Sequence, residues 1–424
     1  MTPSFVHMCA TVLYEHHPAR FYPEGTHLSP MEFLPAIIVL LATAKLFGEI
    51  VERLGYPSMI GEIAAGIVLG PALFGVVAMD STMEIFSDIG IIALLFISGV
   101  ELNLAQLIRA RTVAAATAAA GVAVPFAFGL AAGYALGFPT TESLFLAITL
   151  SITSIGISIR SLIDLKQLTT PVGTTIVSAA VLDDLIGIIL LAGLTALTLP
   201  AGTAFASALT SLALGGLFLL VFATLGRRIM VRLFALARKT ETHEMIYSIA
   251  LLIALLAAYL SHLAGLHYAI GAFIAGLILG DQIRVDRTLL DSLMDFGFGF
   301  FVTIFFASIG LLFSFSKAAL ESSMTLILIV IIVVLAVLGK LIGGFIGSAA
   351  FLGRKDALLV GLGMCPRGEI ALVVAKISLA IGIITADLYS AVTVMVIVSI
   401  VTTPLLLTRG FAWRNASETL PPAE

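Results

Sequence analysis

Apolar segments of about 20 residues follow one another along almost the whole chain, and this pattern limits the possible fold more than any other feature. Of the 424 residues, 60% are apolar and only 11% are charged, a composition outside the range of soluble domains. An α-helix of about 20 apolar residues is long enough to cross a bilayer. The sequence therefore predicts an all-α polytopic membrane protein.

Hydropathy divides residues 31–408 into 13 predicted transmembrane helices. Their approximate limits are 31–53, 58–77, 84–105, 112–137, 142–162, 173–199, 204–226, 243–262, 266–281, 290–314, 321–352, 356–380 and 385–408. Residues 1–30 are expected to form an extension outside the cell, and residues 409–424 a cytoplasmic tail.

The orientation follows from the basic residues in the connections. Sixteen lysines and arginines lie in or beside connections on one side, whereas Arg20 and Lys317 alone lie on the other. Cytoplasmic connections carry the excess of basic residues. We therefore expect a multi-pass protein of the inner (plasma) membrane with its N-terminus outside and its C-terminus in the cytoplasm. The strict alternation also favours an odd number of spans.

Two adjacent carboxylates, Asp183 and Asp184, lie in the apolar segment 173–199. Acidic side chains at membrane depth are costly and typically functional, and two neighbours also repel each other. A cation is needed nearby. Among the few cations within apolar segments, Lys340 is the predicted partner, at a site that exchanges a cation for protons.

An internal repeat with an offset of about 210 residues joins the two halves of the chain. Residues 61–70 and 271–280 are identical at five of ten positions, with three glycines in register, and residues 94–99 have a similar counterpart in 304–310. Small residues at helix contacts recur in many bundles, which is the simpler explanation. Because seven spans separate the copies, the second copy would be inverted, an arrangement typical of secondary transporters.

Two helices are predicted to be broken at matching positions of the repeat. Ser151 to Ser158 interrupts one apolar segment with polar residues and a glycine, and Pro366 and Gly368 interrupt another. Proline removes a backbone donor, and glycine loosens the next turn. Paired breaks of this kind point to an ion site near the midplane, where freed carbonyls and helix dipoles face a small ion.

Six stretches in this order resemble monovalent cation:proton antiporters of the CPA2 branch, in particular NapA-like sodium/proton antiporters. They are Pro57 to Pro71, Leu94 to Glu101, Thr153 to Ile157, Leu182 to Leu185, Gly339-Lys340 and Pro366 to Glu369. The resemblance covers residues 31 to about 408. It implies the NhaA/NapA-like fold, with an inverted-topology repeat and two crossed broken helices, and a homodimer in the lipid bilayer.

By this resemblance, a mobile core (roughly 84–199 and 290–408) moves against panel and dimer helices (31–77 and 243–281), with 204–226 as the linker helix. This is elevator-type alternating access.

The resemblance also assigns roles to the site residues. Asp184 binds the cation, Asp183 pairs with Lys340, and Thr153 and Ser154 lie at the helix break beside them. Relatives with the paired aspartates and this lysine are electrogenic, so we expect electrogenic exchange of sodium or lithium for protons. A potassium/proton antiporter of the same superfamily is the main alternative, because the sequence does not set the size of the cavity.

Three other charged residues of the motifs are expected to support the site without binding the ion. Arg367 and Glu369 would satisfy each other and the backbone of the broken helix, and Glu101 would be an outer or interface group. No cofactor, nucleic acid or soluble partner is expected.

Two other functions fit the sequence less well. An intramembrane aspartyl protease would use Asp184 with Asp281, but Asp281 lacks the required Gly-x-Gly before it and borders a basic loop. A channel would need a continuous pore.

Overall fold

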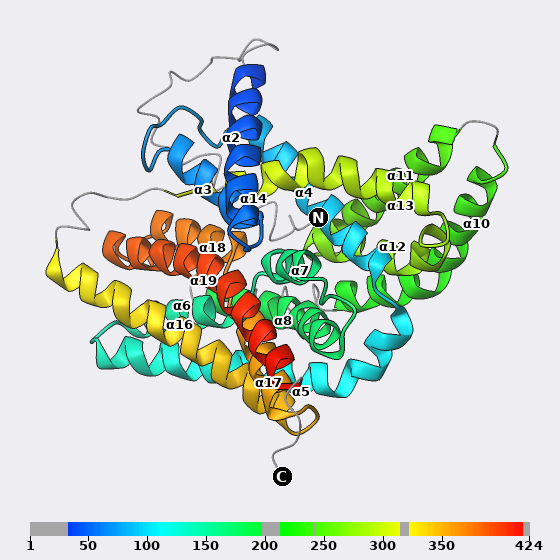
Figure 1. The fold of residues 1–424 in the computed structure, drawn as a ribbon. Coiled ribbons are helices and arrows are strands. Elements are labelled where there is room, and N and C mark those ends of the chain that lie inside the picture. Colours follow the sequence, from blue (N-terminus) through cyan, green and yellow to red (C-terminus); the bar gives the residue numbers. More distant parts are fainter. Residues whose placement is uncertain (1–32, 197–212, 241–242, 314–321, 419–424) are drawn as a thin grey trace.

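The computed structural model describes residues 33–196, 213–240, 243–313 and 322–418, and this part of the chain consists of helices and their connections, with no strand (Figure 1). The first half contains α2 (Phe33–Arg53), α3 (Met59–Leu69), α4 (Ser81–Glu101), α5 (Leu104–Ala135), α6 (Thr140–Ser151), α7 (Ile155–Asp164) and α8 (Pro171–Ala196). The second half contains η1 (Phe222–Gly226), α10 (Arg227–Ala237), α11 (His243–Leu263), α12 (Tyr268–Ile283), α13 (Arg287–Phe296), η2 (Gly297–Phe301), α14 (Val302–Leu311), α16 (Ser323–Ala349), α17 (Arg354–Gly363), α18 (Glu369–Ala380) and α19 (Ala386–Glu418).

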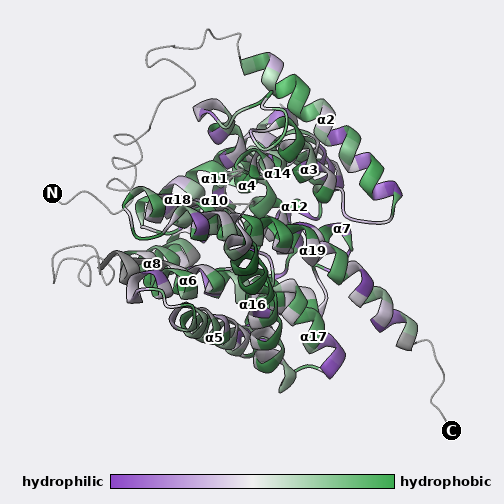
Figure 2. Ribbon diagram, turned by 90° about the vertical axis from the view of Figure 1, so that its left-hand side faces the viewer, coloured by the Kyte–Doolittle hydropathy of each residue, from purple (hydrophilic) through white to green (hydrophobic). Residues whose placement is uncertain are grey.

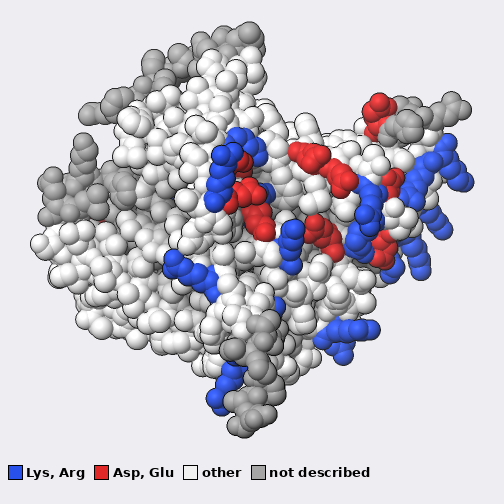
Figure 3. All heavy atoms as spheres, viewed as in Figure 1, with Lys and Arg blue, Asp and Glu red and all other residues white. Residues whose placement is uncertain are grey.

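Apolar residues cover most of these helices, and polar residues gather toward their ends (Figure 2). Within the described ranges, nine helical segments are long and apolar enough to cross a membrane. Charged side chains cover only parts of the face seen in Figure 3, and wide areas of it carry none. A surface of this kind suits a protein surrounded by lipid.

The helices pack into two groups. The first body consists of α2, α3, α4, α10, α11, α12, α13, η2 and α14, and the second body of α5, α6, α7, α8, α16, α17, α18 and α19. The backbones of the two bodies approach each other mainly between α4 and α7 and between α3 and α19, and buried apolar side chains from both bodies share one core. This packing differs from the expected division, which placed 84–105 and 290–314 with the broken helices, because α4 lies against α12 and α14 against α3.

Glycines of the internal repeat make the close contacts inside the first body. Gly66 of α3 lies against the backbone of α14 at Gly310, and its repeat counterpart Gly276 of α12 lies against α4 at Gly99. Glycine permits this approach because a Cβ would collide with the neighbouring backbone. Each copy of the repeated helix therefore packs on a helix from the other half of the chain.

Both predicted helix breaks are confirmed. Residues 152–154 separate α6 from α7, and residues 364–368 separate α17 from α18. The breaks touch each other, since the backbone N–H of Ser154 donates to the carbonyl of Pro366 at 2.9 Å. The hydroxyl of Ser158 in α7 also donates to the carbonyl of Gly363 at the end of α17, at 2.7 Å. Backbone groups that the two interruptions leave without helical partners are thus hydrogen-bonded across the breaks.

Several helix limits differ from the prediction; among them, α5 begins at Leu104 and not near 112. The helix expected over 58–77 ends at Leu69, because Gly70 is extended, as favoured before Pro71. The helix expected to end near 226 continues to Ala237 through a π-helical turn, so Arg227, Arg228 and Arg232 lie on a helix and not in a loop. α19 continues to Glu418, where the cytoplasmic tail was expected from 409, since Arg414 is held by Asp356 of α17 at 3.3 Å. The predicted extension 1–30 lies outside the described residues.

Candidate ion-binding site

A completely buried ion pair joins the second body at its centre. Nζ of Lys340 in α16 donates to Oδ2 of Asp183 in α8 at 2.9 Å, and neither side chain is accessible to solvent. These are the two residues that the sequence pairs, although the roles assigned to them stay predictions. A buried pair of this geometry holds two helices in fixed register, because each charge would be costly without the other.

The backbone around Lys340 is built from small residues and a proline of α5. A Cβ on Gly339 would meet Pro125, and a Cβ on Gly121 would lie 3.9 Å from the Lys340 ammonium. α5 and α16 can therefore approach closely, which places the long lysine side chain between α5 and α8. The sequence signal for this arrangement is the Gly-Lys pair in a span with no other charge.

Asp184 lies beside the pair on α8, and only 5% of its surface is exposed. Gly187 lies four residues after Asp183 and three after Asp184, so it is on the same side of the helix as both aspartates. A Cβ on Gly187 would lie 3.5 Å from the side chain of Ile152, the first residue of the break in 152–154. The acidic face of α8 is thus turned toward the break, and both half-helices α6 and α7 pack on α8.

Two hydroxyls in this break are available to a ligand. Thr153 and Ser154 are buried, and neither side-chain oxygen has a hydrogen-bond partner in the described part of the chain. The second oxygen of Asp183, Oδ1, has none there either. Buried oxygen atoms are normally hydrogen-bonded, so such a group indicates a place where water or an ion is bound. Carboxylate and hydroxyl oxygens together suit a small cation that has lost part of its hydration shell.

Arg367 lies in the other break and is fully buried. Its guanidinium donates to three carbonyls, those of Cys365 at 2.7 Å, Ala336 at 3.1 Å and Leu150 at the end of α6. This cation therefore joins the carbonyls of Leu150 and Cys365, which lie at the two breaks, to a carbonyl inside α16, and it offsets their negative potential. The side chain of Glu369 lies outside the described residues, and the pairing expected between Glu369 and Arg367 stays a prediction.

Glu101 ends α4 in the first body. Within the described residues, no hydrogen bond or ion pair joins it to the aspartates, and its expected supporting role stays a prediction. Sequence reasoning missed Ser399 of α19, whose hydroxyl accepts the backbone N–H of Arg367 at 3.0 Å. A serine in an apolar helix 32 residues away carries no local signal of that contact.

Comparison with known proteins places this arrangement among ion transporters. The family model described as "Sodium/hydrogen exchanger, transmembrane" matches residues 37–409. The Na(+)/H(+)-K(+) antiporter GerN of Bacillus cereus is 32% identical over 385 residues, which cover 91% of this chain and 97% of that protein. A Na(+)/H(+) antiporter of Enterococcus hirae is 33% identical and covers 89% of this chain and 97% of its own length.

Solved structures of the sodium proton antiporter MjNhaP1 from Methanocaldococcus jannaschii have a similar fold. One, from electron microscopy, has a TM-score of 0.71 at 19% identity and covers 94% of this chain and all of that one. Another, at pH 8, has a TM-score of 0.63 at 20% identity and covers 90% of this chain and 96% of that chain.

Proposed function

The chain belongs to the sodium/hydrogen exchanger family, and from this premise we propose that it is a secondary antiporter that exchanges sodium for protons across the inner membrane. The observation that carries the proposal is the completely buried Lys340–Asp183 pair beside a helix break whose hydroxyls, on Thr153 and Ser154, are available to an ion. The sodium/proton antiporters among the relatives support the choice of ion.

Asp184 is the proposed binding group, where a cation and a proton compete. A carboxylate at an aqueous cavity holds one or the other, and this competition couples the two fluxes. Thr153 and Ser154 supply oxygens that replace water around the cation. Arg367 carries a fixed charge that holds the two breaks together. Lithium, which has the same charge and a smaller radius, is a further proposed substrate.

The proposed movement is an elevator, in which the second body slides against the first and carries the site from one side of the membrane to the other. The division rests on the backbone packing, in which helices of the same body lie closest to one another, while buried apolar side chains of both bodies line the surface along which they would slide. The proposal includes 13 spans, an inverted repeat with crossed broken helices, a homodimer, an outside N-terminus and a cytoplasmic C-terminus.

Exchange is proposed to be electrogenic. Lys340 pairs with Asp183, so the site contains two carboxylates and one cation. If binding of the metal ion at Asp184 releases protons from more than one group, more protons than metal ions move in each cycle. This charge balance is testable apart from the identity of the ion.

Potassium/proton exchange is the second candidate. One observation favours it, because the relative GerN is described as a Na(+)/H(+)-K(+) antiporter. Selectivity among alkali cations depends on cavity size and on the number of coordinating oxygens.

The test uses purified protein in liposomes that contain a pH dye and have a set membrane potential. Sodium, lithium or potassium is added outside, for the wild type and for Asp184→Asn, with Asp291→Asn as a matched control on exposed α13. We expect sodium and lithium to drive proton movement that responds to the potential and is absent in Asp184→Asn. A response to potassium alone would establish the second candidate, and normal exchange by Asp184→Asn would refute the proposed site.

A further inference from the structure

Arg160 of α7 reaches from the second body to the first. In the sequence it is one of the sixteen basic residues in or beside the connections that are expected to face the cytoplasm, yet only 7% of its surface is exposed. Its guanidinium donates to the hydroxyl of Ser58, at the start of α3, at 3.0 Å. It also lies over the ring of Phe298 in η2, with its central carbon 4.3 Å from the ring centroid. One side chain thus contacts two separate elements of the other body.

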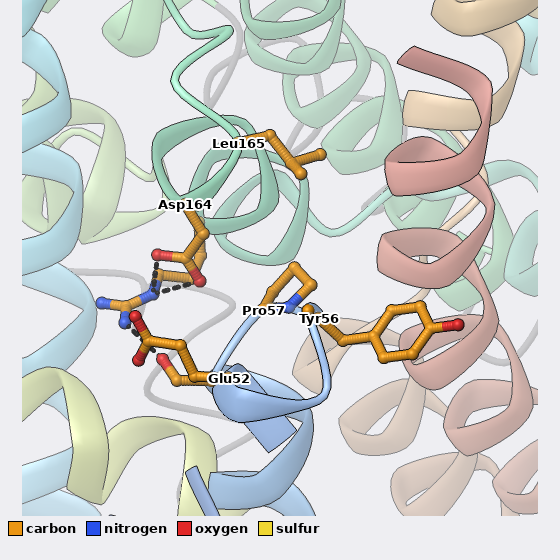
Figure 4. A pocket seen from close by; sticks show the side chains of 8 residues that line it. Glu52, Tyr56, Pro57, Asp164 and Leu165 are labelled. Carbon is orange, nitrogen blue, oxygen red and sulfur yellow. Dashed lines mark hydrogen bonds and ion pairs between the residues drawn. The ribbon is translucent and has the colours of Figure 1, made fainter. Parts of the chain in front are cut away.

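The charge of Arg160 is balanced within its own helix. Asp164, one turn further along α7, accepts from Nε of Arg160, and the closest approach is 3.0 Å. The pair borders a cavity of about 240 Å³ between the bodies, into which Glu52 of α2 also points (Figure 4). Because Asp164 moves with Arg160, the contacts with Ser58 and Phe298 can break without leaving either charge unpaired.

The receiving surface on the first body is held in place by its own contacts. Nζ of Lys45 donates to the carbonyl of Phe298 at 2.8 Å and lies 3.7 Å from Oε1 of Glu62. The hydroxyl of Thr303 donates to the same carboxylate oxygen at 2.9 Å. These bonds tie α2, α3, η2 and α14 together around the point where Arg160 arrives. The contact is therefore made with a rigid surface, and its loss would require movement of α7 itself.

The internal repeat provides no second copy of the contact between Arg160 and Ser58. The offset of about 210 residues maps Arg160 onto Ile370 or Ala371 of α18, and Ser58 onto Tyr268 of α12. Apolar side chains have no hydrogen to donate to such a bond, and the Tyr268 hydroxyl donates to Asp88 of α4 at 2.6 Å. The two ends of the molecule are thus unlike, although the backbone repeats.

We propose that Arg160 is a latch that holds the two bodies together at one end and so favours one of the two access states. The inference rests on the proposed elevator movement. Arg160 is six residues from Ser154, about 9 Å along the same short helix. A displacement of the ion-binding break and a displacement of the latch are therefore one movement. Breaking the contact with Ser58 shifts the equilibrium toward the state in which α7 is separated from the start of α3; we call the contact surface between these two segments the seam.

The experiment measures how often the seam opens, by means of a cysteine that is buried between α3 and α7 while the seam is closed. Met59 is fully buried, and its sulfur lies 3.9 Å from the hydroxyl of Ser161 in α7. Met59→Cys is made in a chain in which Cys9 and Cys365 are replaced by serine. The protein is placed in nanodiscs, where both faces are accessible, and its reaction rate with a charged maleimide is measured.

We expect Ser58→Ala and Arg160→Lys each to raise the labelling rate about tenfold, the effect of losing one hydrogen bond to a charged group. The double variant Arg160→Met/Asp164→Asn, which leaves no unpaired charge, should also label faster. The matched control is Arg53→Ala, which removes an exposed arginine paired with Glu49 inside α2, and it should label at the wild-type rate. Unchanged labelling in the three latch variants would overturn the inference, as would equally fast labelling in the control.

Labelling requires no transported ion, so the two proposals fail separately. A chain that labelled as expected but exchanged no cation for protons would refute the proposed function and leave the latch standing. A chain that exchanged sodium for protons but labelled equally in all variants would refute the latch alone.

Discussion

Lys340 and Asp183 are 157 residues apart in the chain, yet their charged atoms lie 2.9 Å apart with no access to solvent. The pair therefore has two separate consequences, one for stability and one for transport. Removing a single partner leaves an uncompensated charge in the interior, whereas replacing both removes the charge altogether.

Lys340→Met should lower the free energy of unfolding by about 3–5 kcal/mol, the usual cost of breaking a buried ion pair. The double variant Lys340→Met/Asp183→Asn should recover most of that loss. Thermal unfolding in detergent, followed by intrinsic fluorescence, measures both. Additive losses in the double variant would show that the two residues do not act as a pair.

Asp183→Asn leaves Lys340 without its partner and should also lower stability, but the protein that folds should still exchange sodium for protons, without dependence on membrane potential. The reason is that the site loses one carboxylate while Asp184 is kept. Flux in liposomes clamped at two potentials measures the difference. Equal dependence on potential in the variant and the wild type would show that Asp183 is not needed for electrogenic exchange.

Thr153→Val should raise the KM for sodium about tenfold with little change in melting temperature, because the hydroxyl has no protein partner within the described residues. Ser158→Ala is the matched control, since that hydroxyl is already used by the carbonyl of Gly363. It should lower the melting temperature and leave the KM unchanged. If Ser158→Ala raised the KM and Thr153→Val did not, the ion would not bind at the hydroxyl of Thr153.

Gly66→Ala should destabilise the first body by at least about 1–3 kcal/mol, because a Cβ there overlaps the backbone of α14 at Ala307. Gly216→Ala, in a helix where a Cβ meets nothing within 4 Å, is the control and should be neutral or slightly stabilising. Melting temperatures of the two variants make the comparison. Equal effects would mean that α3 and α14 can separate at no cost.

Arg367→Lys should lower stability by about 1.5–3 kcal/mol for each carbonyl that loses its charged donor. A single ammonium group cannot serve Leu150, Ala336 and Cys365 from the positions that the planar guanidinium occupies. Arg53→Lys, at an exposed site, should have no effect. Unfolding in detergent distinguishes the two, and an unchanged Arg367→Lys melting temperature would count against a role in joining the breaks.

Several features of this protein were determined by short-range sequence patterns. Apolar runs predicted the membrane helices, since each span has to bury its own backbone polar groups whatever surrounds it. Pro366, Gly368 and the polar run around Thr153 marked both helix breaks for a similarly local reason. The carboxylates at 183 and 184 and the single lysine of α16 were conspicuous because charge is rare at that depth.

Only the tertiary structure decided how the helices are shared between the two bodies and how the bodies meet. Periodicity shows that a helix buries a face, but not which neighbour covers it. The sequence could not indicate that α4 packs against α12 and α14 against α3, whereas the expected division grouped both with the broken helices. The sequence indicates only that Arg160 is one of many basic residues near a connection, whereas the structure places it against Ser58 and Phe298. These contacts join residues more than 100 positions apart, and their free energy depends on shape and charge that meet only after the chain has folded.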